Sequence, residues 1–174
     1  TFAGDLTIDD GTLSITTANG LGEAAKGTVV EGNGTLNLNN LSLASLEVIE
    51  ISGSGIGNIG ALTATGTSSI AASNTLLMGA DATIGGGGTL TLLTVLDNDG
   101  ARALTKTGSG TLILAADNSA SFVSATGTIT INAGAIKVTD AGALGDALGG
   151  TTIANDAVLE FALGGSATVT ENLS

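Results

Sequence analysis

A long internal repeat is the feature that most constrains the fold of this chain. Residues 6–38, beginning LTIDDGTLSITTANGLG, align without a gap on residues 129–161, beginning ITINAGAIKVTDAGALG, at an offset of 123 residues. The shared positions are apolar residues at spacing two and glycines where turns are expected, such as Gly11 with Gly134. Spacing of two indicates half-buried strands. A supersecondary unit that recurs in this way is typical of a repeat architecture.

The same strand pattern continues through most of the chain. GTLNL at Gly34, GTLTL at Gly88 and GTLIL at Gly110 each follow one glycine with alternating apolar residues. Glycine suits a tight corner because positive φ costs other residues roughly 1 kcal/mol or more. The predicted structural corner glycines are Gly11, Gly108, Gly110, Gly134 and Gly145. Helical signal is limited to about one turn in GLGEAAKG and in ALGDALGG.

Composition favours a solenoid over other all-β folds. The 174 residues include 28 glycines, three phenylalanines and no other aromatic residue. A sandwich about 10 Å thick usually needs larger core side chains, whereas stacked Leu, Ile, Val and Ala can fill a β-helix with the strand spacing of about 4.8 Å. We therefore predict an all-β solenoid of roughly eight coils, taking on the order of 20 residues per coil. Residues 1–174 are expected to be a single β-helical segment of a longer repeat protein.

The charge and the missing residue types exclude several function classes. A net charge of −12, from 16 acidic and four basic residues, repels phosphate backbones and anionic lipids, so neither nucleic acid nor a membrane is expected as a partner. Without histidine or cysteine, a zinc site would have to use carboxylates alone, which is unusual. We expect no cofactor. No apolar stretch of about 18 residues or targeting signal is present, and the missing initiator Met indicates a fragment or a processed segment.

Residues 104–145, LTKTGSGTLILAADNSASFVSATGTITINAGAIKVTDAGALG, resemble the autotransporter-associated β-strand repeat of bacterial passenger domains. The positions that carry the resemblance are Leu104, Lys106, Gly108, Gly110, Leu112, Leu114, Ile129, Ile131, Gly134, Ile136, Val138, Ala143, Leu144 and Gly145. The middle of the segment departs from the family, because it keeps Phe122 but lacks the usual glycine pair. The resemblance implies a right-handed parallel β-helix, displayed on the bacterial cell surface or secreted, and no common catalytic residue. We accordingly expect Lys106 at a coil edge, with its stem over apolar surface and its amine in water.

The leading functional prediction is a structural or adhesive segment without enzymatic activity, forming a stalk, an adhesin shaft or a surface fibre. Expected partners are further copies or coils joined end to end, and a surface polysaccharide or a ligand on a host or neighbouring cell. The alternative is a β-helical polysaccharide-degrading enzyme, which would use paired carboxylates. Glu47 and Glu50 fit that role poorly, because their odd spacing places them on opposite sides of one strand. Asp9 and Asp10 precede a turn glycine.

Two further motifs have both a functional and a structural interpretation. Residues 55–60 spell G-x-G-x-x-G after an apolar strand, which makes a dinucleotide-binding domain a remote alternative. The fingerprint requires a following helix, but threonines and serines that disfavour a helix come next. Asp97 and Asp99 in LDNDGAR are weak metal candidates, since they form part of a calcium loop without its downstream Glu. A tight turn is the favoured interpretation, and we predict that calcium is not required.

Overall fold

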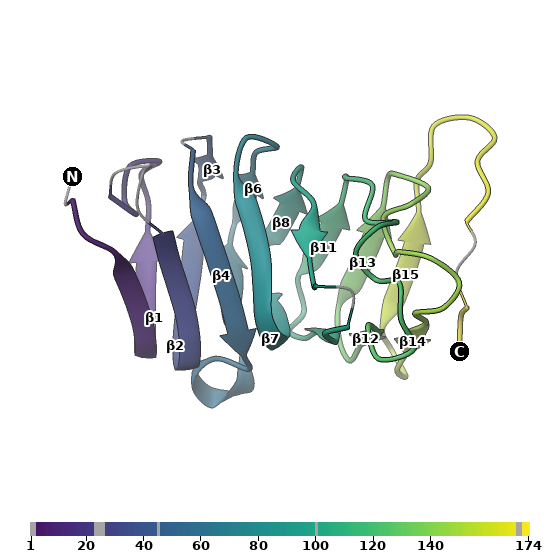
Figure 1. Ribbon diagram of the computed structural model, residues 1–174, viewed down its shortest axis with the longest axis horizontal. Helices are drawn as coiled ribbons and strands as arrows, with labels where there is room; N and C mark the ends of the chain where they lie inside the picture. Colours follow the sequence, from purple (N-terminus) through teal and green to yellow (C-terminus); the bar gives the residue numbers. More distant parts are fainter. Residues whose placement is uncertain (1–2, 23–26, 45, 100, 170–171) are drawn as a thin grey trace.

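The computed structural model describes residues 3–22, 27–44, 46–99, 101–169 and 172–174. These residues form fifteen strands and one short 3-10 helix, η1 (Ile56–Asn58). The chain winds into an elongated solenoid of about seven turns, with its two ends at opposite ends of the long axis (Figure 1). All strand pairs between the turns are parallel. The predicted all-β solenoid is therefore confirmed, with close to the expected number of coils.

The strands stack in three parallel ladders, to which successive turns contribute. The first ladder contains the first halves of β1 (Leu6–Ile15), β2 (Gly27–Asn39) and β7 (Thr75–Gly86), with β4 (Val48–Gly53) and β9 (Leu96–Asp97). The second contains the second halves of β1, β2 and β7, with β5 (Leu62–Thr65), β10 (Leu104–Lys106), β12 (Ile129–Ile131) and β14 (Thr151–Ile153). The third contains β3 (Ser42–Leu43), β6 (Thr67–Ile70), β8 (Thr89–Leu92), β11 (Thr111–Leu114), β13 (Ala135–Val138) and β15 (Val158–Phe161). Counted from the amino terminus, turn one contains β1, turn two β2 and β3, turn three β4 to β6, turn four β7 and β8, turn five β9 to β11, turn six β12 and β13, and turn seven β14 and β15.

Aliphatic side chains at equal heights fill the interior of the solenoid. In the third ladder, Leu90, Leu112 and Ile136 are in register and almost completely buried. The buried hydrophobic residues form one continuous cluster along the rod. Because each fully buried Leu or Ile stabilises the fold by about 1.5–3 kcal/mol, the period-two pattern of the sequence is the main source of stability.

Two different constraints act on the predicted corner glycines. Gly11, Gly108, Gly134 and Gly145 have positive φ, with values of 79°, 72°, 71° and 98°. Gly110 is not among the positive-φ residues, but a Cβ there would overlap the carbonyl oxygen of Gly88 in the preceding turn. Close approach of neighbouring turns thus constrains Gly110, whereas backbone conformation constrains the other four.

The two copies of the internal repeat occupy different ladders. Leu6 pairs with Thr28 in the first ladder, whereas Ile129 pairs with Leu104 in the second. The offset of 123 residues therefore corresponds to five turns and one further ladder, not to a whole number of turns. The repeated unit is a strand, a positive-φ glycine and a second strand, and this unit fits either corner.

Neither short helical signal gives an α-helix in the described residues. Residues 143–150 form turns, and residues 23–26 of GLGEAAKG lie outside the described residues. The glycines in residues 143–150 favour turns over helix because they lower helix propensity. Within the described ranges, no helix is long and apolar enough to span a membrane.

Candidate functional site

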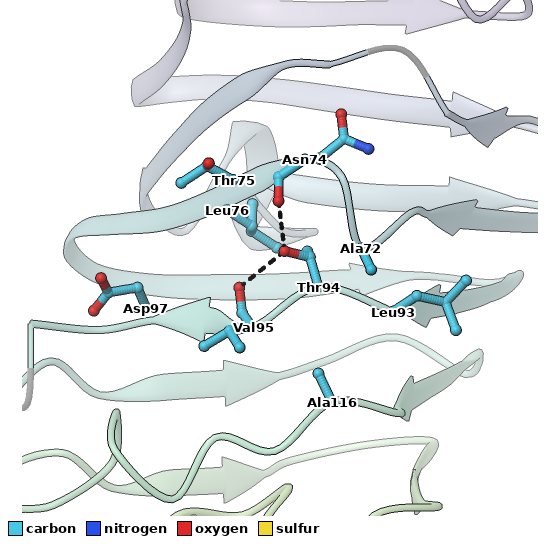
Figure 2. A pocket seen from close by; sticks show the side chains of 9 residues that line it. All are labelled: Ala72, Asn74, Thr75, Leu76, Leu93, Thr94, Val95, Asp97 and Ala116. Atoms are coloured by element: carbon cyan, nitrogen blue, oxygen red, sulfur yellow. Dashed lines mark hydrogen bonds between the residues drawn. The ribbon is translucent and has the colours of Figure 1, made fainter.

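The candidate site is a shallow hollow of about 340 Å³ on the outside of the solenoid (Figure 2). Its lining residues are Ala72, Asn74, Thr75, Leu76, Leu93, Thr94, Val95, Asp97 and Ala116. The hollow forms because β9 has only two residues and, among the described residues, no strand follows it in the first ladder. The loop of the next turn supplies a side chain instead, since Asn118 Oδ1 accepts the Leu96 N–H at 3.0 Å.

Buried polar contacts hold the hollow in shape. The Thr94 hydroxyl donates to the carbonyl oxygen of Asn74 at 2.7 Å, which joins turns four and five (Figure 2). The Asn74 amide donates to the carbonyl oxygens of Leu43 and Ala71. Asp97 is the one titratable side chain among the nine lining residues, so the hollow itself contains no pair of acid and base groups.

Four exposed aliphatic residues form what we name the apolar strip: Leu46 and Val48, with Leu93 and Val95, which line the hollow. Their exposed fractions are 61%, 44%, 46% and 42%. Val48 pairs with Thr75, and the register of Leu76 with Leu96 places Val95 beside the same threonine. The outward positions Thr67 and Thr89 of the third ladder are polar by comparison. The apolar strip differs from these positions because its side chains are both exposed and aliphatic.

The weak metal candidates form a turn. Asp97 Oδ1 accepts the Asp99 N–H at 3.0 Å, and Asp99 has a φ of 53°. Asp99 also lies 3.6 Å from the Arg102 guanidinium. Gly100 of the same motif lies outside the described residues. Across the described ranges, no group of three or more Asp, Glu, His or Cys side chains is placed to hold a metal ion; the lack of a calcium requirement stays a prediction.

The structure separates the two glutamates that were considered as a catalytic pair. Glu47 points inward and is 4% exposed, and its Oε1 accepts a hydrogen bond from the Thr28 hydroxyl at 2.9 Å. Burial raises the pKa of Glu47, and the hydrogen bond from Thr28 opposes part of this rise. The residues of β4 alternate between buried and more exposed, and Glu50 lies on the more exposed side. Asp9 and Asp10 are both exposed.

The G-x-G-x-x-G motif forms a loop between two strands. Gly55, Gly57 and Gly60 all have positive φ, and η1, which contains Gly57, lies between Gly55 and Gly60. A Cβ on Gly55 would overlap the carbonyl oxygen of Gly60, so the glycines allow a tight loop. The next elements in the described residues are β5 and β6. The helix that would hold a pyrophosphate in a dinucleotide-binding domain is not present after this motif.

The expectation for Lys106 is wrong. Its side chain is 1% exposed and points into the solenoid. The ammonium group donates to the carbonyl oxygens of Thr107, Gly108 and Ala133 at 2.7, 3.1 and 3.2 Å. The signal that could have revealed this position is the alternation itself, because Lys106 lies two residues after the buried Leu104 on the same strand.

Comparison with known families confirms the resemblance found in the sequence. Residues 104–138 match the family model described as the passenger-associated-transport-repeat. This segment covers β10 to β13, which form most of two successive turns. The comparison with curated proteins gives no match, and neither does the comparison with solved structures.

Proposed function

We propose that this chain is a structural segment of a bacterial passenger domain and serves as part of an extended shaft. The observation that carries this proposal is the continuity of the ladders through the passenger repeat. Strands β10 and β11 pair with β7 and β8 on one side and with β12 and β13 on the other. Each turn thus rests on its neighbours, which is the physical basis of an elongated solenoid.

As part of this proposal, the passenger repeat implies that the segment is displayed outside the bacterial cell. The test is to place a short epitope in the exposed turn at Gly164 and Gly165, where a Cβ would meet no atom within 4 Å. Antibody should label intact cells that produce the parent protein, and protease added outside should remove the label. Labelling that requires permeabilised cells would contradict surface display.

End-to-end contact with further coils or copies is the second part of the proposal. Residues 172–174 already extend the second ladder, since Ser174 donates to Thr151 and accepts from Ile153. Beside them, Phe161 and Val158 of β15 are 42% and 51% exposed at the end of the third ladder. An edge with free backbone groups and exposed apolar side chains favours further strand pairing.

Mutual repulsion from the net charge of −12 opposes contact between copies, and salt screens this repulsion. Light scattering over a salt series should therefore show association that increases with ionic strength. A monomer at every salt concentration would contradict self-association, while leaving the shaft proposal intact.

A plain stalk and an adhesin shaft differ in whether this segment binds a cell surface. The double variant Leu93→Asp and Val95→Asp removes half of the apolar strip, and Leu148→Asp is a control at another exposed apolar position. Cell binding that is lost only in the double variant would support adhesion through the strip. No binding by the unaltered protein would support a stalk.

A further inference from the structure

Lys106 occupies an aliphatic position in the interior of the second ladder. The strand registers place Ile84 on one side of it and Ile131 on the other, and both neighbours are buried. Leu62 and Ile153 continue the same row of side chains. The stem of Lys106 therefore packs as one more aliphatic side chain, and its amine lies at the end of that stem inside the solenoid.

The amine reaches a corner where three carbonyl oxygens need a donor. Thr107 and Gly108 belong to turn five, whereas Ala133 belongs to turn six. In the part of the chain that the structure describes, no backbone N–H donates to any of these three oxygens. An unpaired buried carbonyl is costly, so the amine supplies what the backbone does not and ties the two turns together.

No counter-ion accompanies this buried amine. Among the described residues, no carboxylate oxygen lies within 4.0 Å of it. The titratable residues on the elements packed around it are Asp81 of β7 and Lys137 of β13. Asp81 is exposed and accepts the Ala103 N–H, and Lys137 is paired with Glu160 on the outer surface. Lys106 thus faces carbonyl oxygens and aliphatic groups alone.

We propose that Lys106 makes the corner between turns five and six a proton-responsive joint, which is more stable when its amine is neutral than when it is charged. The ammonium form can satisfy all three carbonyls, but it places an uncompensated charge in apolar surroundings. The neutral form has two donors and no charge to desolvate. The second effect is the larger one, because Lys106 is almost completely buried and no carboxylate oxygen of the described residues lies within 4.0 Å of its amine. Consistent with this geometry, burial lowers the pKa of Lys106 to about 8 from its ordinary value of 10.5.

The direction of the pH effect follows from this difference. Between about pH 8 and pH 10.5 the unfolded chain binds the proton and the folded chain does not, so stability increases with pH in that window. Below this window both states are protonated and the gain is absent. The sequence has no histidine, cysteine or tyrosine, so the lysines and the amino terminus are the groups that titrate between pH 7 and pH 10.

The test is urea unfolding at pH 7 and at pH 10 for the unaltered protein, Lys106→Met and the surface control Lys137→Met. The unfolding constant of the unaltered protein and of Lys137→Met should fall on the order of fiftyfold from pH 7 to pH 10. Lys106→Met should show no such fall. The proposal would be overturned if the unfolding constant of the unaltered protein stayed the same or rose from pH 7 to pH 10, relative to the change seen in Lys106→Met.

A direct titration keeps the proposal testable if Lys106→Met does not fold. Nuclear magnetic resonance of the lysine side chains in the unaltered protein gives the midpoint for each amine. The Lys106 midpoint should lie near 8, well below the ordinary lysine value of 10.5. A Lys106 midpoint equal to or above 10.5 would show that the three carbonyls outweigh burial, and would overturn the proposal.

Discussion

Replacement of corner glycines by alanine should separate the cost of backbone conformation from the cost of contact between turns. Gly134 has a φ of 71°, and a Cβ there would overlap the carbonyl oxygens of Gly108 and Gly110 and lie 3.0 Å from the Lys106 amine. Gly11 occupies the equivalent place in the repeat with a φ of 79°, but a Cβ there meets no atom within 4 Å. The two glycines share the backbone constraint and differ in their surroundings.

The expected magnitudes follow from these two terms. Positive φ costs an alanine about 1 kcal/mol, and an overpacked site that must displace backbone atoms adds about 1–3 kcal/mol. For a chain of this size, 1 kcal/mol lowers Tm by about 2–4 °C. Gly11→Ala should therefore lower Tm by about 3 °C, and Gly134→Ala by about 5–15 °C.

Thermal unfolding followed by circular dichroism measures both shifts. Because Gly11 lies in the first turn, where fraying could hide part of the cost, Gly57→Ala provides a control in turn three. Gly57 has a φ of 59° and open space around its Cβ position, so its shift should equal that of Gly11→Ala. If Gly134→Ala lowered Tm by no more than these two variants, close packing of corner glycines against the carbonyl oxygens of the preceding turn would make no contribution to stability.

Three further predictions concern metal, acid and a buried amide. Addition of a chelator should leave the melting curve unchanged, and a large fall in Tm would show that a cation stabilises the fold. Glu47→Gln should raise stability at pH 7 by roughly 1 kcal/mol, because the raised pKa makes charged Glu47 the unfavourable form; the gain should shrink as pH falls and Glu47 becomes protonated, in unfolding measured at both pH values. Asn118→Ala should lower stability by about 2–4 kcal/mol, because the side chain accepts from Leu96 and donates to Ala143 in buried positions; a change below 0.5 kcal/mol in urea unfolding would contradict this account.

Local periodicity made most of the fold predictable, because a parallel solenoid is a sum of local strand and corner units. The alternation in GTLIL marks Leu112 and Leu114 as interior residues, and both are buried. The position of Gly134 marks a corner, and its φ is positive. These features depend on a few neighbouring residues each, so one sequence is enough to reveal them.

Contacts between turns were harder to predict, because they depend on register. The apolar strip combines Val48 with Val95, which are far apart in sequence and lie on either side of Thr75 only through the pairing of β4, β7 and β9. Asn118 replaces a missing strand partner across one turn, and no spacing rule identifies such a residue. The hollow in Figure 2 lies beside β9, the short strand that Asn118 contacts, so its location depends on how many residues each turn contains.

The error at Lys106 has a physical reason that also explains why the position tolerates a lysine. The charge of Lys106 favours a position in water, since an isolated buried ammonium is normally far too costly, whereas the alternation of β10 places its side chain inside. The cost is reduced here because the corner brings together three carbonyl oxygens without backbone donors. At the preceding turn the corresponding corner differs, as the carbonyl oxygen of Gly86 already accepts the Gly110 N–H at 3.0 Å. At that turn the interior position equivalent to Lys106 is occupied by an aliphatic residue, Ile84. The interior side chain at each of these two turns thus matches whether the carbonyl oxygens of the adjacent corner already have a backbone donor.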